Sequence, residues 1–262
     1  VILKPIEQSI KRKIESVGTP LKDWDIQINY GIKTGFNDAF IINTEKRNEI
    51  LDNCSSDEER TKTAELIRPI LRGRDIKRYG YDWANLWLIN THNGIKGVKP
   101  RIDVNDYPAV KAHLDQYWDK ISKRADKGDT PYNLRNCAYL EDFLLPKLIY
   151  PETTQGAFFA YDETGLFLDK TCFMMISKHA RYLQATLSSQ LFEFAYKRIF
   201  SSVELGQHGF QYNKHALIKL PIKKFNESDS VAYSDEFFYN CYGITNEEIE
   251  YITGAIQSLQ NQ

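Results

Sequence analysis

Between residues 146 and 176 the sequence contains a series of short, mostly apolar segments separated by turn residues. The segments occupy residues 147–150, 157–160, 166–168 and 172–177, and Asp-Glu-Thr-Gly at residues 162–165 separates two of them. Runs of this length, bounded by turn-forming residues, predict β-strands rather than helices. Because short connections join neighbouring antiparallel strands, we expect a β-meander here.

Two further strands are expected near the N-terminus. Apolar residues alternate over residues 26–30, and residues 39–42 form a second apolar run. Alternation of period two predicts a strand, and we expect residues 39–42 to be its partner in a hairpin. Gly31 and Gly35 lie between them, where glycine allows a positive φ or a close approach of the backbone to a ligand.

Helical patterns lie on both sides of these strands. Ser56 with Glu59 and Thr245 with Glu248 have the spacing of capping boxes at helix N-termini. Helical periodicity predicts helices over residues 5–17, 44–51, 56–68 and 180–200, and after residue 245. A further helix is expected from Pro108 to Gly128, with a buried stripe of Val110, Leu114, Trp118 and Ile121. Because helices and strands interleave irregularly, the sequence predicts an α+β fold with mixed, mostly antiparallel sheets and flanking helices.

The charged residues are strongly segregated along the chain. The net charge is −1, yet all 34 lysines and arginines lie at or before Lys224. Residues 1–224 therefore carry a net charge of +6, and residues 225–262 carry −7. A basic body of this kind favours a polyanionic partner over a small neutral ligand.

The remaining bulk features exclude several classes of protein. Cys54, Cys137, Cys172 and Cys241 are too widely spaced for a zinc motif or a disulfide framework, so we expect reduced thiols in a cytoplasmic protein. No run of about 18 apolar residues predicts a membrane-spanning helix. The sequence begins at Val1 without an initiator methionine, and we expect it to be a piece of a longer protein.

The most basic stretch of the sequence is residues 68–79. Five cationic residues and one anionic residue lie between Arg68 and Arg78, next to Gly73 and Tyr79. We expect this stretch to be a loop that binds a polyanion, because arginine forms paired hydrogen bonds with guanine and backbone amides near glycine bind phosphates. Asn and Gln can read adenine in the same way. The candidate DNA-binding residues are Lys33, Thr34, Gly35, Asn37, Arg68, Arg72, Gly73, Arg74, Lys77, Arg78, Tyr79, Lys147, Tyr150, Gln207 and Gln211.

Three segments of the sequence partly match catalytic or metal-binding motifs. Asp-Thr-Pro-Tyr at residues 129–132 resembles the Asp/Asn-Pro-Pro-Tyr motif of amino-directed DNA methyltransferases but lacks its first proline. Asp-Ile-Lys at residues 75–77 has the spacing used by metal-dependent nucleases, without a partnering acidic strand. His208 and His215 have no Cys or carboxylate pair to complete a metal site. We therefore predict no catalytic residue and no metal ligand in this chain.

The order and spacing of several segments resemble a known protein family. The first is Gly-Ile-Lys-Thr-Gly-Phe-Asn-Asp-Ala-Phe-Ile at residues 31–41, and the others are residues 70–76, 88–90, 132–135, 146–150, 187–191, 220–222 and 246–249. Together they resemble the TaqI-like C-terminal specificity domain of type II restriction–modification N6-adenine DNA methyltransferases. The resemblance covers about residues 28–252 of the chain.

This resemblance implies a target-recognition domain that binds a short duplex DNA site. A separate N-terminal domain of the same polypeptide would methylate adenine with S-adenosylmethionine, and the parent enzyme could also use Mg²⁺ in a nuclease domain. Residues 1–22 would be a linker or docking helix, residues 23–224 the recognition domain, and residues 225–262 an acidic helical tail packed on the same domain. The alternatives are a catalytic nuclease or methyltransferase fragment and the specificity subunit of a multisubunit restriction system.

Overall fold

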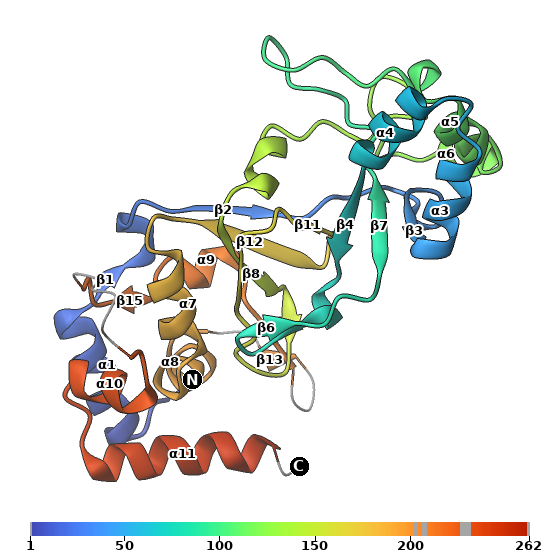
Figure 1. Cartoon of the computed structure of the whole chain (residues 1–262). Coiled ribbons are helices and arrows are strands. Elements are labelled where there is room, and N and C mark those ends of the chain that lie inside the picture. The colour runs from blue at the N-terminus through green and yellow to red at the C-terminus, as the bar shows by residue number, and fades with distance from the viewer. Residues whose placement is uncertain (1, 202–203, 206–208, 226–231, 261–262) are drawn as a thin grey trace.

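The computed structural model describes residues 2–201, 204–205, 209–225 and 232–260 (Figure 1). The α-helices are α1 (Pro5–Val17), α2 (Asn37–Phe40), α3 (Thr44–Asp52), α4 (Asp57–Leu66), α5 (Pro108–Asp115), α6 (Trp118–Ile121), α7 (Ala180–Ser188), α8 (Gln190–Ala195), α9 (Lys214–Leu217), α10 (Asp235–Cys241) and α11 (Asn246–Gln260). A π-helical turn, η5 (Tyr196–Phe200), continues α8.

The strands are short and are distributed over several sheets. They are β1 (Thr19–Pro20), β2 (Gln27–Tyr30), β3 (Ile41–Asn43), β4 (Ile67–Leu71), β5 (Ile76–Lys77), β6 (Gly80–Tyr81), β7 (Leu86–Ile89), β8 (Lys147–Pro151), β9 (Thr153–Thr154), β10 (Ala160–Asp162), β11 (Phe167–Leu168), β12 (Cys172–Ile176), β13 (Glu204–Leu205), β14 (Gly209–Gln211) and β15 (Pro221–Ile222). Among the strands of the described ranges, only β11 and β4 pair in parallel. The predicted α+β class with mostly antiparallel sheets is confirmed.

The sheet β10-β8-β12-β2 separates two hydrophobic cores. Leu148 and Tyr150 of β8 point into one core and Ile149 into the other, because successive side chains of a strand face opposite sides. One core is covered by α1, α7, α8, α10 and α11, and the other by α2 to α6 and a second sheet, β11-β4-β7-β3. Figure 1 shows these as two lobes on either side of β2, β8 and β12. The continuous apolar character of β8 is thus that of a strand buried on both faces.

The strands of residues 146–176 do not form the simple meander that the sequence predicted. β8 lies between β10 and β12, whereas β9 pairs with β14 and β11 with β4. Residues 157–159 precede β10 without joining a ladder. Successive strands of this segment therefore belong to different sheets: β8, β10 and β12 share one sheet, whereas β9 and β11 each join another.

The predicted hairpin of residues 26–42 is wrong. β2 pairs with β12, residues 37–40 form α2, and β3 pairs with β7 in the second sheet, β11-β4-β7-β3. Gly31 explains the difference, because a Cβ on Gly31 would lie 1.8 Å from the carbonyl oxygen of Asp169. The backbone at Gly31 thus runs against residues 168–169 instead of turning back on itself.

The predicted helix ends also need correction. The helix after Ser56 ends at Leu66, and residues 67–71 form β4, whose Ile70 and Leu71 are fully buried. The helix of residues 180–200 is broken at Ser189, which has an extended backbone and accepts the amide hydrogen of Phe192. An N-cap inside an apolar helical pattern starts a new helix in a new direction. The helix expected from Pro108 to Gly128 divides into α5 and α6 and ends at Ile121, and Trp118, expected in its buried stripe, is 43% exposed.

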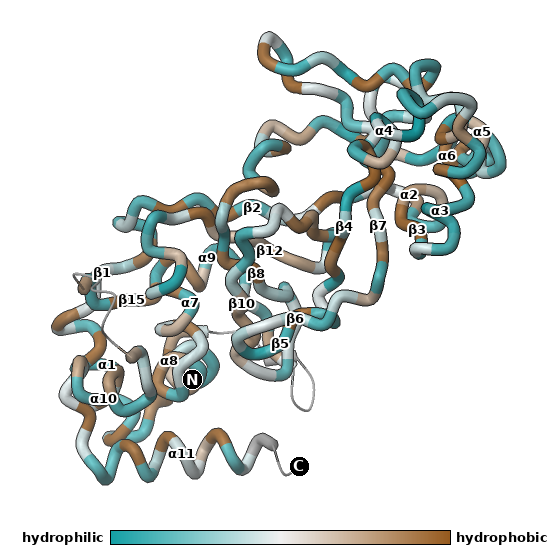
Figure 2. The backbone as a smooth tube through the Cα atoms, in the orientation of Figure 1, coloured by the Kyte–Doolittle hydropathy of each residue, from teal (hydrophilic) through white to brown (hydrophobic). Residues whose placement is uncertain are grey.

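The acidic tail packs on the lobe that contains α1. Figure 2 shows hydrophobic and hydrophilic residues alternating along α11, as an amphipathic helix requires. Glu248 accepts hydrogen bonds from Ser9 and Lys13 of α1, each at 2.7 Å. Tyr251 donates to Glu7 of α1 at 2.9 Å. The negative charge of the tail is therefore partly neutralised by the first helix of the chain.

Candidate nucleic-acid interface

The basic stretch of residues 68–79 is folded rather than a free loop. It completes β4, forms the 3-10 turn η2 (Gly73–Asp75) and enters the β5–β6 hairpin. Gly73 is buried, and its amide donates to Thr171 Oγ1 at 2.8 Å. A Cβ at this position would lie 3.0 Å from the carbonyl oxygen of Thr171. Gly73 is therefore needed for close backbone packing, and its amide is already used.

Arg72 and Asp75 form a closed ion pair within this stretch. The guanidinium donates to Asp75 through Nε at 3.1 Å and Nη2 at 2.8 Å, and the amide of Arg72 donates to the same carboxylate at 2.9 Å. The hydrogen bond with Asp75 raises the pKa of Arg72. Because the buried Asp75 carboxylate is engaged and Lys77 Nζ donates to the carbonyl oxygen of Arg74, the Asp-Ile-Lys nuclease interpretation has no support in this geometry.

Arg78 reaches into the opposite lobe. Its guanidinium donates to the carbonyl oxygen of Ser188 and to the carboxylate of Glu193, which is 5% exposed. The charge of Arg78 is thus used to join the hairpin to the start of α8. A phosphate would have to compete with a nearly buried carboxylate for it.

The exposed groups of this stretch are Arg74, Lys77 and Tyr79. Tyr79 lies at the turn of the β5–β6 hairpin with φ of 68° and is 60% exposed. A non-glycine residue in the left-handed region carries a conformational cost, which the turn of this hairpin imposes on Tyr79. Arg68 is half-buried, with its guanidinium 5.9 Å from the centre of the Phe167 ring.

The second predicted group of site residues lies in the loop of residues 31–37. Lys33 is exposed and pairs with Asp126 at 3.0 Å. Thr34 is buried, and its hydroxyl donates to the exposed Asn37 side chain at 2.6 Å. Gly35 has φ of 73°, as the turn requires. The loop therefore offers Lys33 and Asn37 to solvent and keeps Thr34 as a structural residue.

Arg124 holds this loop in place. It is buried, and its guanidinium donates to the carbonyl oxygens of Thr34 at 2.9 Å and Asn133 at 2.7 Å. It also donates to the carbonyl oxygens of Ile121, Asp126 and Pro131. Burial lowers the pKa of Arg124 to about 10. A single side chain thus fixes the loop of residues 31–37 against residues 121–133.

The remaining predicted residues differ in exposure. Lys147 and Tyr150 of β8 are fully buried, and Lys147 Nζ lies 2.6 Å from Asp162 Oδ2. Neither side chain has surface to offer to DNA in this structure, and both are core residues. Gln211 is partly exposed, and its Nε2 atom donates to Thr153 Oγ1 at 3.5 Å. Gln207 lies outside the described residues.

The sequence reasoning missed a cationic surface beside the loop of residues 31–37. A pocket of about 530 Å³ lies between this loop and α6, and Lys120 and Lys123 line it. Lys127 and Arg135 are exposed close by in the chain, and Arg135 shares Asp126 with Lys33. The available signal was the lysines and arginines of residues 120–135, which are less dense than those of residues 68–79 but equal in number.

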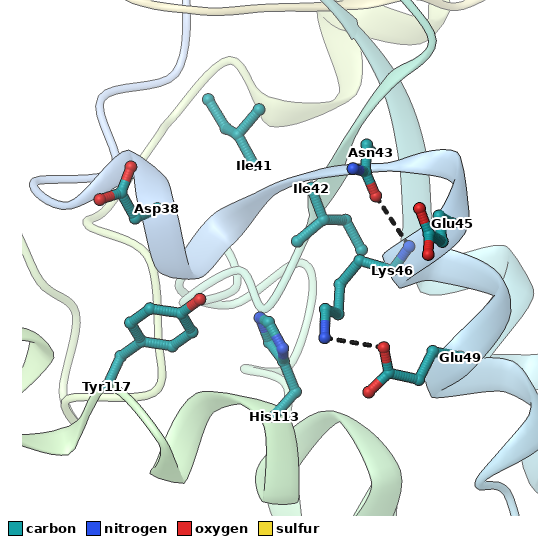
Figure 3. Close-up of a pocket in the computed structure, with 9 residues that line it drawn as sticks. All are labelled: Asp38, Ile41, Ile42, Asn43, Glu45, Lys46, Glu49, His113 and Tyr117. Carbon is teal, nitrogen blue, oxygen red and sulfur yellow. Dashed lines mark hydrogen bonds and ion pairs between the residues drawn. The ribbon is translucent and has the colours of Figure 1, made fainter.

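A second pocket, of about 370 Å³, lies between α3 and α5 (Figure 3). In it Lys46 pairs with Glu49 at 2.8 Å, and the Nε2 atom of His113 lies 2.8 Å from the carbonyl oxygen of Ala39. Burial lowers the pKa of His113, which favours the neutral ring. Among the residues drawn in Figure 3, Lys46 contacts Asn43 and Glu49, and no Ser, Cys or Thr lies among them that could act as a nucleophile beside a base.

The Asp-Thr-Pro-Tyr segment is also engaged in local structure. The amide of Asp129 donates to Asn93 Oδ1 at 2.9 Å, and the Tyr132 hydroxyl donates to Asp115 at 2.6 Å. Thr130 and Asn133 are hydrogen-bonded at 2.6 Å. Across the described ranges, no group of three or more His, Cys, Asp or Glu side chains is arranged to hold a metal ion. In the same ranges, no helix has the length and apolar character to cross a membrane.

Comparison with known proteins gives the family. The TaqI-like C-terminal specificity domain matches residues 68–222, which is more than half of the sequence. The chain belongs to this family. This match confirms the resemblance that the sequence motifs indicated.

Relatives and solved structures agree with this assignment. The domain is 24% identical over 154 residues to the Type II methyltransferase M.BanIII of Aneurinibacillus aneurinilyticus, a match over 58% of this chain and 26% of the relative. Its fold is similar to the Type IIL restriction-modification enzyme MmeI in complex with DNA (TM-score 0.60, 13% identity, 93% of this chain and 37% of that chain). It is also similar to the type IIG restriction endonuclease BpuSI (TM-score 0.57, 15% identity, 98% and 33%). The specificity domain thus spans between about a quarter and somewhat more than a third of the length of these proteins.

Proposed function

We propose that this specificity domain recognises a short sequence in duplex DNA on behalf of a restriction–modification enzyme. The observation that carries the proposal is the family match, taken together with exposed cationic and amide side chains on two ordered surface elements. One element is the loop of residues 31–37 together with the cationic surface beside it, and the other is the β5–β6 hairpin. Cations would hold phosphates, while Asn37 and Arg74 have the chemistry to read base edges.

The catalytic steps would belong to another part of the parent polypeptide. An N-terminal methyltransferase domain would bind S-adenosylmethionine and methylate N6 of adenine, and a nuclease domain using Mg²⁺ could be fused to it. The sequence has no Gly-x-Gly-x-x-Gly turn of the kind that binds such a cofactor after a strand, and charged side chains line much of both pockets described above. Action on DNA and a role in defence against phage would place the parent enzyme in the cytoplasm.

Neutralisation of the hairpin tests the proposal directly. The variant Arg74→Gln/Lys77→Gln removes two exposed charges without touching the core. If both contact phosphates, the slope of log K against log salt should fall by about 2, with weaker binding at low salt, because each phosphate contact contributes about 0.9 to the slope. Fluorescence anisotropy with a labelled duplex measures both quantities.

The control is Lys11→Gln/Lys22→Gln, which removes the same charge from the lobe that contains α1. This variant should bind DNA like the unmodified domain. An unmodified domain that does not bind duplex DNA at low salt would contradict the proposed function. Equal binding by the hairpin variant and the control would remove Arg74 and Lys77 from the interface.

A further inference from the structure

A basic hairpin, residues 94–101, projects from the lobe that contains β4 and β7. It is the loop that extends farthest at the top of Figure 1. Its tip, Lys96-Gly97-Val98, is exposed, and Val98 is 77% exposed. The hairpin contains Lys96, Lys99 and Arg101 and no acidic residue.

The backbone of this hairpin is set by its own hydrogen bonds. Ile95 and Lys99 exchange two backbone hydrogen bonds of 2.8 Å, and the amide of Val98 donates to Ile95 at 2.9 Å. Gly94 and Gly97 have φ of 72° and 76°, and a Cβ on Gly94 would lie 2.4 Å from the carbonyl oxygen of Lys99. The shape is therefore built into the sequence, so little conformational entropy remains to be lost on binding.

The base of the hairpin is tied to the cationic surface beside the loop of residues 31–37. Asn93 Oδ1 accepts the amide hydrogen of Asp129 at 2.9 Å, and Asn93 Nδ2 donates to Asn136 Oδ1 at 2.5 Å. The amide of Gly94 donates to His92 Nδ1 at 3.0 Å. Because residues 129–133 are in turn held by Arg124, the hairpin and the loop of residues 31–37 are parts of one ordered surface.

The charges of the hairpin are available to a polyanion. Lys99 pairs with Glu141 at 2.7 Å and Arg101 with Asp129 at 3.5 Å, and all four side chains are at least 39% exposed. Exposed ion pairs of this kind contribute little and exchange readily for a phosphate. Lys96 makes no ion pair within the part of the chain that the structure describes.

We propose that the basic hairpin enters the major groove of duplex DNA, with Lys96 on a phosphate and Val98 against a thymine methyl group. The inference rests on the proposed function. The major groove is wide enough for a two-stranded ribbon, and apolar side chains read the thymine methyl there. A rigid, acid-free hairpin with an apolar tip fits this groove better than it fits a protein surface, where its lysines would need acidic partners.

Two single variants and two duplexes test this placement. Lys96→Gln should weaken binding to an alternating dA·dT duplex severalfold and reduce the salt slope by about 1, whereas the matched Lys11→Gln on α1 should change neither. Val98→Ser should weaken binding to the same duplex. It should lose no affinity for a duplex in which uracil replaces thymine, because the methyl group is already absent.

The outcomes separate this inference from the proposed function. Both variants are at exposed positions, and unchanged melting temperatures would confirm that the fold is intact. If the unmodified domain binds DNA and Lys96→Gln binds with the same affinity and salt slope, the hairpin is not a DNA contact and the inference is overturned. If Val98→Ser loses equal affinity for both duplexes, the thymine contact is wrong. Failure of the unmodified domain to bind any duplex would overturn the proposed function itself.

Discussion

At the scale of single residues, exposure divides the basic stretch into structural and available groups. Arg72 is closed on Asp75 and Arg78 on Glu193, whereas Arg74 and Lys77 are exposed. The sequence gives all four the same character, because it contains no information about which carboxylate lies nearby in space. The density of arginine therefore predicts the kind of partner, but only the fold selects the residues that can meet it.

A substitution at Tyr79 should affect stability and DNA binding in opposite directions. Its φ of 68° is favourable for glycine and costly for tyrosine, so Tyr79→Gly should increase the free energy of unfolding by about 1 kcal/mol. The same change removes an exposed tyrosine side chain and should weaken binding to duplex DNA if that side chain contacts the sugar or phosphate of the backbone. Urea unfolding and fluorescence anisotropy measure the two effects.

Asn85, the other described non-glycine residue with positive φ, at 56°, is the matched control. Asn85→Gly relieves a similar backbone conformation away from the hairpin and should leave DNA binding unchanged. Binding of Tyr79→Gly equal to that of the unmodified domain would show that the ring has no part in the interface.

At the scale of elements, local sequence patterns predict helices and their caps well, because these depend on residues close together in the chain. The period of α1 and the caps at Ser56 and Thr245 are confirmed, since helices and caps depend on contacts within a few residues. The partner of β3 is β7, more than 40 residues away, and no local pattern encodes such a pairing. The same reason explains Lys147, whose basic character indicated DNA although its partner is Asp162 inside the core.

The Lys147–Asp162 pair makes a prediction about β8. Both side chains are fully buried, and Asp162 also accepts the amide hydrogens of Thr164 and Leu166. Lys147→Met leaves a buried carboxylate without its cation and should lower the free energy of unfolding by about 3 kcal/mol. Urea unfolding measures the change. Lys170→Met, at an exposed position before β12, should change it by less than about 0.5 kcal/mol, and an equally small effect at Lys147 would contradict a role for the pair in stability.

At the scale of the whole molecule, two cores joined by one sheet should unfold as a unit whose stability depends on pH. Burial is the main cause that lowers the pKa of both His92 and His113. The unfolded chain therefore binds more protons than the folded chain below about pH 6.5, and stability should fall as the pH drops through this range. His113→Gln should reduce the slope of stability against pH.

Urea unfolding between about pH 7.5 and 5 measures this slope. This pH interval lies above the one in which protonation of the carboxylates with lowered pKa begins to reduce stability; these are Glu7, Glu59 and Glu248. A stability that is constant down to about pH 5 would contradict the assignment of both histidines as neutral buried groups.

The most direct measurement of sequence-specific recognition is selection from a library of random duplexes. The domain is incubated with the library at moderate salt, and bound duplexes are recovered and sequenced over several rounds. We predict enrichment of one short sequence by the unmodified domain. Arg74→Gln/Lys77→Gln should enrich this sequence less, and Lys11→Gln/Lys22→Gln should enrich it as much as the unmodified domain does. Recovery of duplexes without any common sequence would contradict the proposal that this domain specifies a DNA target.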